Sequence, residues 1–150
     1  MTTALRLVAA SVLVTAAIVV GTASGSAPRN GAFKTPSGNI VCGYAFSTDG
    51  RSASIGCGIK SGLKPAPRNT CVDIDYSGKA VSLTATGRGR PVVCAGDPGP
   101  FLVEAKARVL RYGKSWHGGG IACTSRRAGL TCTNRRGHGF FLSREHWRAF

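Results

Sequence analysis

The chain has 150 residues, which is enough for one domain and too few for two independent hydrophobic cores. It carries 20 Lys and Arg residues against 6 Asp and Glu residues, so its formal net charge is +14. Such a charge bears on partners and solubility rather than on the fold, and it favours polyanions such as nucleic acid, anionic lipid headgroups or acidic wall polymers. A solvated surface that only keeps an exported protein soluble explains the charge equally well.

The N-terminal residues predict a signal peptide over residues 1–23. Arg6 is the only charge, residues 7–20 contain no charge, Pro or Gly, and small residues follow up to a cleavage site after Ala23. Fourteen helical residues span about 21 Å, less than the ~30 Å hydrocarbon core, so no permanent membrane span is expected after cleavage. An uncleaved membrane anchor is the alternative. Cleavage removes Arg6 and lowers the formal charge from +14 to +13.

The cysteines predict disulfides rather than a metal site. Their number is even and all lie beyond the predicted signal, which in an exported protein indicates three disulfides. No two are spaced as Cys-x-x-Cys, so neither a zinc site nor any other cofactor is expected. The six are Cys42, Cys57, Cys71, Cys94, Cys123 and Cys132.

Residues 24–32 are predicted to be a flexible leader, and residues 33–150 a single domain. Short β-branched and aromatic runs between Gly and Pro turns predict a mainly β fold, namely a small disulfide-stapled antiparallel sheet or barrel-like domain with a short C-terminal helix. Residues 40–47 and 52–59 form the first predicted hairpin, joined by a two-residue type I′ turn at Asp49 and Gly50. Counting outward from that turn places Cys42 opposite Cys57, where a cross-strand disulfide is feasible.

The middle of the chain predicts a meander. Residues 60–70 contain two prolines and are expected to be a loop, whereas residues 71–76 alternate apolar and acidic side chains as in a half-buried strand. A turn at 77–79, a strand at 80–86, a turn at 87–90 and a strand at 91–95 follow, and Cys94 is the natural partner of Cys71. Residues 101–112 have spacings that permit either a helix or a strand, and we predict a strand.

The last third predicts a second hairpin and a helix. After a turn at 113–120, residues 121–125 and 130–133 pair around a four-residue loop, which again sets Cys123 opposite Cys132. Ser143 is suited to cap a short helix that runs to the C-terminus, with Glu145 in its first turn.

Candidate catalytic residues are scattered along the sequence. A triad of Asp97, His138 and Ser143 can be assembled, but no G-x-S-x-G motif supports it. A basic ribonuclease or other hydrolase of polyanions needs an acid and a base beside a cation. The side chains available for those two roles are His117, His138, Glu104 and Glu145. Nothing in their spacing joins them, so no catalytic residue is assigned.

Two further readings concern partners. The basic doublets at residues 126–127 and 135–136 are expected at opposite ends of one strand, and no row of aromatic residues accompanies them to stack bases. A monomer with a diffuse cationic surface for an acidic cell-wall polymer or other polyanion is therefore favoured over a specific nucleic-acid binder. The loop at 61–70, with Lys64, Pro65 and Ala66, is the place where a protease inhibitor would present its reactive site.

Longer motifs point to a family. The segments TPSGNIVC at 35–42, GLTCTN at 129–134 and GHGFFLSR at 137–144 resemble an actinobacterial family of small secreted or membrane-tethered domains of unknown function. The resemblance covers about residues 33–150. It implies an exported, disulfide-bonded domain with no established activity and no defined catalytic residues. The leading hypothesis is thus a non-enzymatic secreted or cell-envelope domain, either released or retained at the wall.

Overall fold

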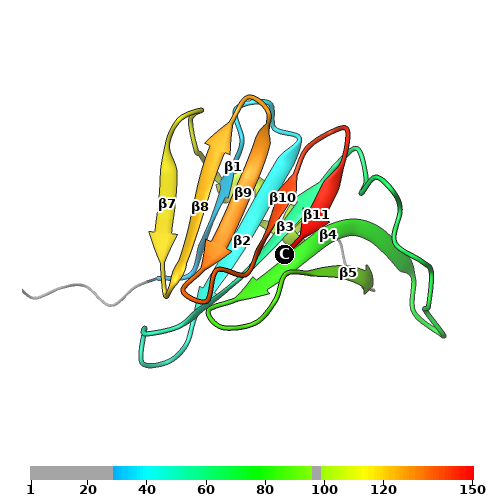
Figure 1. Ribbon diagram of the computed structural model, residues 1–150, viewed down its shortest axis with the longest axis horizontal. Coiled ribbons are helices and arrows are strands. Elements are labelled where there is room, and N and C mark those ends of the chain that lie inside the picture. The colour runs from blue at the N-terminus through cyan, green and yellow to red at the C-terminus, as the bar shows by residue number, and fades with distance from the viewer. Residues whose placement is uncertain (1–28, 96–98) are drawn as a thin grey trace, which may run out of the picture.

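The computed structural model describes residues 29–95 and 99–150 and consists of two packed β-sheets (Figure 1). The first sheet has the strand order β5-β4-β3-β2-β1-β6, and the second has the order β11-β10-β9-β8-β7. The first sheet is built from β1 (Gly31–Lys34), β2 (Ile40–Phe46), β3 (Ala53–Ile59), β4 (Tyr76–Thr84), β5 (Arg90–Cys94) and β6 (Arg108–Val109). The second contains β7 (Ser115–Gly118), β8 (Ile121–Arg126), β9 (Gly129–Asn134), β10 (Gly139–Leu142) and β11 (Trp147–Ala149).

The predicted mainly β, disulfide-stapled fold is confirmed, with two refinements. The strands form two sheets rather than one sheet or barrel, and β6 pairs in parallel with β1 at the edge of the first sheet. The fold also begins earlier than predicted, because β1 starts at Gly31 and the Asn30 side chain accepts a hydrogen bond from the Phe46 amide. The predicted signal peptide lies outside the described residues. Within residues 29–95 and 99–150, no helix is long and apolar enough to cross a membrane.

The first hairpin has the predicted register but a different turn. Cys42 pairs with Cys57 as expected, yet the Ser47 amide donates to the Ser52 carbonyl at 2.9 Å and closes a four-residue loop. A type I′ turn needs positive φ at both central residues, and of the two only Gly50 has it, at 68°. The Asp49 carboxylate instead accepts hydrogen bonds from the Ser47 hydroxyl and the Arg51 amide. The predicted two-residue turn and the observed four-residue loop are both centred between Asp49 and Gly50, so the strands pair in the same register.

The second hairpin also has the predicted register, and it extends into a third strand. Its loop is shorter than the four residues predicted, because Arg126 pairs with Gly129 and two residues lie between them. Cys123 pairs with Cys132 across β8 and β9. The segment predicted as a turn at 113–120 contains β7, which pairs with β8. Two consecutive glycines with positive φ, Gly119 at 52° and Gly120 at 85°, form the tight turn between them. That conformation explains why glycine occupies both positions.

The core lies between the two sheets and contains two of the three disulfides. Cys42–Cys57 and Cys123–Cys132 each have a Cα–Cα distance of 4.0 Å, typical of narrow, non-hydrogen-bonded pairs in an antiparallel ladder. All four cysteines are fully buried in the same cluster as Ile55, Leu83, Leu130 and Phe140. The third disulfide, Cys71–Cys94, ties the long loop before β4 to β5. The first two disulfides join the residues that the turn counts place opposite each other, and the third joins Cys71 with the partner expected across the meander.

The predicted strand at 71–76 is wrong. Val72 is 79% exposed and Ile74 is 55% exposed, so the alternating pattern faces solvent on both sides. The strand begins instead at Tyr76 and passes through the predicted turn at 77–79 as a bulge, with Gly78 at a positive φ of 53°. Gly78 allows the local twist that keeps β4 paired with β5 beyond the bulge.

The predicted strand at 101–112 is mostly a 3-10 helix, η1 (Gly99–Lys106), followed by the two-residue β6. η1 lies on the outer face of the first sheet, where glycines leave room for its side chains. A Cβ atom built at Gly58 would lie 2.7 Å from Phe101, and one at Gly43 would lie 3.3 Å from Val103. The apolar spacing read from the sequence does not explain this helix, since Leu102 is 65% exposed and Val109 is 53% exposed, whereas Phe101 and Val103 contact the sheet.

The predicted C-terminal helix is also wrong. Ser143 makes the contacts of a helix cap, since its hydroxyl accepts from the amides of Glu145 and His146. The Ser143 amide then donates to the His146 carbonyl, which closes a turn, and Trp147–Ala149 returns along β10 as β11. The Trp147 amide donates to the Lys64 carbonyl, so the long loop covers the edge of β11.

Asn134 connects the two sheets by hydrogen bonds. It is 8% exposed, and its side-chain amide donates to the carbonyls of Thr84 and Gly87 in the first sheet. Its Oδ1 accepts from the amides of Arg136 and His138, which shapes the turn between β9 and β10. One buried side chain therefore satisfies four backbone groups.

Replacing Asn134 is expected to destabilise the fold strongly. Asn134→Ala removes four partly buried hydrogen bonds and should lower the free energy of unfolding by about 2–4 kcal/mol. Urea denaturation followed by tryptophan fluorescence measures this loss. Asn69→Ala is the control, because exposed Asn69 makes one local bond to the Cys71 amide. Equal effects of the two substitutions would contradict the connecting role of Asn134.

Candidate functional site: an arginine-lined cleft

Three turns meet at one end of the sandwich, the upper end in Figure 1, and enclose a polar cleft of about 250 Å³. The turns are the β1–β2 loop, the β8–β9 hairpin and the β10–β11 turn, joined by Tyr112. Two of the three motif segments found in the sequence, at 35–42 and 129–134, begin here, and the third, at 137–144, ends here. Packing of the two sheets against each other therefore brings residues more than a hundred positions apart into one site.

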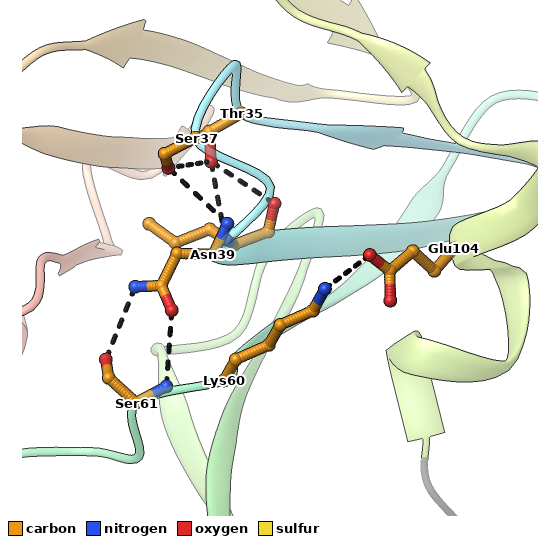
Figure 2. Close-up of polar contacts among 7 residues, drawn as sticks. Thr35, Ser37, Asn39, Lys60, Ser61 and Glu104 are labelled. Carbon is orange, nitrogen blue, oxygen red and sulfur yellow. Dashed lines mark hydrogen bonds and ion pairs between the residues drawn. The ribbon is translucent and has the colours of Figure 1, made fainter.

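The β1–β2 loop forms a rigid wall of the cleft (Figure 2). Thr35 is 3% exposed, and its hydroxyl contacts the Ser37 hydroxyl at 3.2 Å and accepts from the Ile40 amide. The Asn39 side chain donates to the Ser61 hydroxyl and accepts from the Ser61 amide. The loop is thus held from both sides, and its polar groups are largely satisfied within the protein.

The cationic groups come from the other two turns. Arg126, Arg127 and Arg144 line the cleft and are exposed. Among the residues that the structure describes, the single ion pair is Lys60–Glu104, so none of these arginines has a carboxylate partner. Arg127 lies over the ring of Tyr112, with its guanidinium carbon 5.4 Å from the centroid. This contact orients one guanidinium and leaves its N–H donors available.

Glu145 is the acidic residue of the cleft lining. Hydrogen bonding with the Ser143 hydroxyl lowers the pKa of its carboxyl from the usual 4.5, with a smaller contribution from Arg144. The carboxylate therefore stays ionised at neutral pH. Three positive charges against one negative charge leave the cleft cationic, with guanidinium donors suited to carboxylate, sulfate or phosphate groups.

The structure separates the residues of the predicted triad. His138 precedes β10 and Ser143 follows it, so four residues of strand, about 13 Å, lie between them. The Ser143 hydroxyl donates to the His146 carbonyl and belongs to the turn. Asp97 lies outside the described residues.

The residues considered for a hydrolase are also dispersed. Glu104 is on η1 and pairs with Lys60 at 2.5 Å, whereas His117 is on β7 at the other sheet. His146 stacks on Phe141 with ring centroids 5.1 Å apart. Within the described part of the chain, no group of three or more His, Cys, Asp or Glu side chains could hold a metal ion.

The loop considered for protease inhibition is tied to the C-terminal strand. Lys64 and Pro65 are exposed, but the Lys64 carbonyl accepts from the Trp147 amide and the Pro65 carbonyl accepts from the Trp147 indole at 2.8 Å. These carbonyls are therefore occupied within the molecule. A protease that binds a loop as an extended strand needs such backbone groups for itself.

Sequence reasoning found the arginine doublets but not the cleft. The doublets lie at opposite ends of β9, as predicted, since Arg126 and Arg127 are at its start and Arg135 and Arg136 follow its end. The contributions of Arg144 and Tyr112 were missed. The signal that could have found them is the position of the motifs, because each of the three contains or borders a turn.

No curated protein and no solved structure matches the chain. Residues 11–150 match a protein family described as "Family of unknown function (DUF6636)". Since the match covers nearly all of the sequence, the chain belongs to this family of unknown function.

Proposed function

We propose that the protein is an exported, non-enzymatic domain that binds an acidic polymer through the arginine cleft. The observation that carries the proposal is the convergence of Arg126, Arg127 and Arg144 on one cleft without carboxylate partners among the described residues. Three buried or half-buried disulfides support an oxidising compartment outside the cytoplasm. Acidic wall polymers are a natural ligand class there.

The cleft supplies binding rather than bond cleavage. The serine and threonine hydroxyls of its lining are engaged: those of Thr35 and Ser37 within the β1–β2 loop and that of Ser143 with the β10–β11 turn. The groups that remain available are guanidinium donors, which bind anionic oxygens in a bidentate manner. The overall charge of +14 would attract a polyanion from a distance, and the cleft would then hold one of its acidic groups.

Removing the cleft arginines is expected to weaken binding far more than removing the same charge elsewhere. R126Q/R127Q/R144Q should lower the affinity for inorganic polyphosphate about ten- to a hundredfold near 0.1 M salt, because three exposed charge contacts worth up to about 1 kcal/mol each are lost. The matched control is R51Q/R88Q/R90Q, which removes three exposed arginines from turns and an edge strand of the first sheet.

Fluorescence anisotropy across a salt series measures both variants against the wild type. The control variant should lose no more than about threefold, which reflects its lower net charge alone. Equal losses for the two variants would show that binding is diffuse and would contradict a role for the cleft. Unchanged urea denaturation midpoints confirm that both variants fold.

Neutralising Glu145 is expected to strengthen anion binding. Glu145→Gln removes a repelling charge and should raise the affinity for polyphosphate about two- to fivefold at pH 7, because an exposed charge acts only weakly through water. The lowered pKa of Glu145 sets the pH dependence. As pH falls through that pKa, below 4.5, the wild-type carboxyl becomes neutral and the two proteins should bind equally.

Asp49→Asn provides the control for this substitution. The pKa of Asp49 is lowered by hydrogen bonds with Ser47 and Arg51, so it too is ionised at pH 7. Asp49 lies at the far end of β2 from the cleft, and the seven residues of that strand span about 20 Å. An increase in affinity for D49N as large as that for E145Q would contradict a local effect.

A further inference from the structure

The two sheets differ in what covers their outer faces. η1 packs on the outer face of the first sheet, over β1, β2 and β3. The outer face of the second sheet, toward the viewer in Figure 1, carries no helix among the described residues. Burial alternates along its strands, with Ile121, Cys123 and Ser125 of β8 buried and the residues between them outward. A five-stranded sheet thus presents one broad face to solvent.

Five side chains, one from each strand, form a row across this face, and four of them are polar. Register pairs join them in sequence: Ser115 with Thr124, Thr124 with Thr131, Thr131 with Phe141, and Phe141 with Arg148. The Ser115 and Thr124 hydroxyls are hydrogen-bonded at 2.8 Å. Neighbouring strands lie about 4.8 Å apart, so the row is about 19 Å long. It consists of three hydroxyl groups, an aromatic ring and a guanidinium.

The row continues into the arginine cleft. Arg126 lines the cleft and lies two residues beyond Thr124, on the same face of β8. Gly129, which also lines the cleft, is covered by the Phe141 ring, because a Cβ atom at Gly129 would lie 2.7 Å from that ring. The cleft and the row are therefore adjacent, and a ligand held in the cleft can extend over the row.

The charged side chains of this face are positive. None of the five strands β7 to β11 contains Asp or Glu, while Arg126 and Arg148 point outward from β8 and β11. Positive groups at the end and the edge of the face complement an acidic chain laid across it. The hydroxyl groups between them can both donate and accept hydrogen bonds. Ionised phosphate or carboxylate groups only accept hydrogen bonds and do not require acceptors in the protein.

We propose that the acidic polymer is a polysaccharide and that its sugar rings lie across β7 to β11 along this row. The inference rests on the proposed function, since the acidic group of the polymer occupies the arginine cleft. Sugar hydroxyls pair with those of Thr124 and Thr131, and the half-buried Phe141 ring, beside His146, offers its remaining apolar surface to a sugar. Single-stranded nucleic acid fits less well, because base binding uses several aromatic platforms and this row has one.

The test compares sugar-based and sugar-free polyanions on the disulfide-bonded protein. T124V/T131V removes two hydroxyl groups while keeping the shape and strand preference of the side chains. Its matched control is T48V/T86V, which removes two exposed hydroxyls from turns of the first sheet. The probes are polygalacturonate, dextran sulfate, inorganic polyphosphate and poly(U) RNA, each titrated at the same charge concentration.

We expect T124V/T131V to lower the affinity for polygalacturonate or dextran sulfate about tenfold and to leave polyphosphate binding within twofold. T48V/T86V should change neither. If T124V/T131V binds both polysaccharides like the wild type while R126Q/R127Q/R144Q loses all polyanions, the polysaccharide inference is overturned and the proposed function stands. If the arginine variant keeps its binding, the proposed function itself fails. Preferential binding of poly(U), lost in F141L, would assign the row to RNA instead.

Discussion

Two cross-strand disulfides determine how the rest of the molecule is arranged. Cys42–Cys57 and Cys123–Cys132 occupy narrow pairs at the centre of their hairpins and meet in one buried cluster. A slip of one residue in either hairpin would break the disulfide and turn every core side chain to solvent. The disulfides therefore fix the inner faces of both sheets. They also fix the outer faces, where Thr124 and Thr131 point to solvent.

The hydrogen bonds between the two sheets use backbone groups at strand ends and in loops. Asn134 binds carbonyls of the opposite sheet, Gly119 accepts from the Ala53 amide, and Trp147 binds the loop at Lys64. Small residues and satisfied backbone groups are needed where the sheets approach so closely. The end of the sandwich is then free to carry long polar side chains. The arginine cleft lies at this end, on turns whose own polar groups are already paired.

Strand pairing within the two hairpins was predicted well from the sequence, whereas the structure of single segments outside the hairpins was predicted less well. Turn chemistry and cysteine spacing located both central hairpins, because a symmetrical loop gives the same register whatever its turn type. The strand at 71–76 and the helix after Ser143 were wrong because local patterns cannot report long-range partners. Val72 and Ile74 alternate with aspartates, but no sheet lies against them. Trp147 instead pairs with the free edge of β10, so the chain there forms a strand. The cleft was not predictable from spacing alone, since its three turns are joined only in the folded chain.

The distribution of charge explains how such a basic chain keeps an unpaired cationic site. Acidic side chains are few, and those described lie largely away from the second sheet: Glu104 pairs with Lys60, and Asp73 and Asp75 lie in the exposed loop before β4. Mutual repulsion of exposed arginines is weak in water and falls further with salt. Each disulfide closing a loop of about 15 residues contributes roughly 3 kcal/mol, which outweighs that repulsion. Arginines on turns are therefore compatible with a stable fold, and their guanidinium donors would remain available for the anion that we propose as ligand.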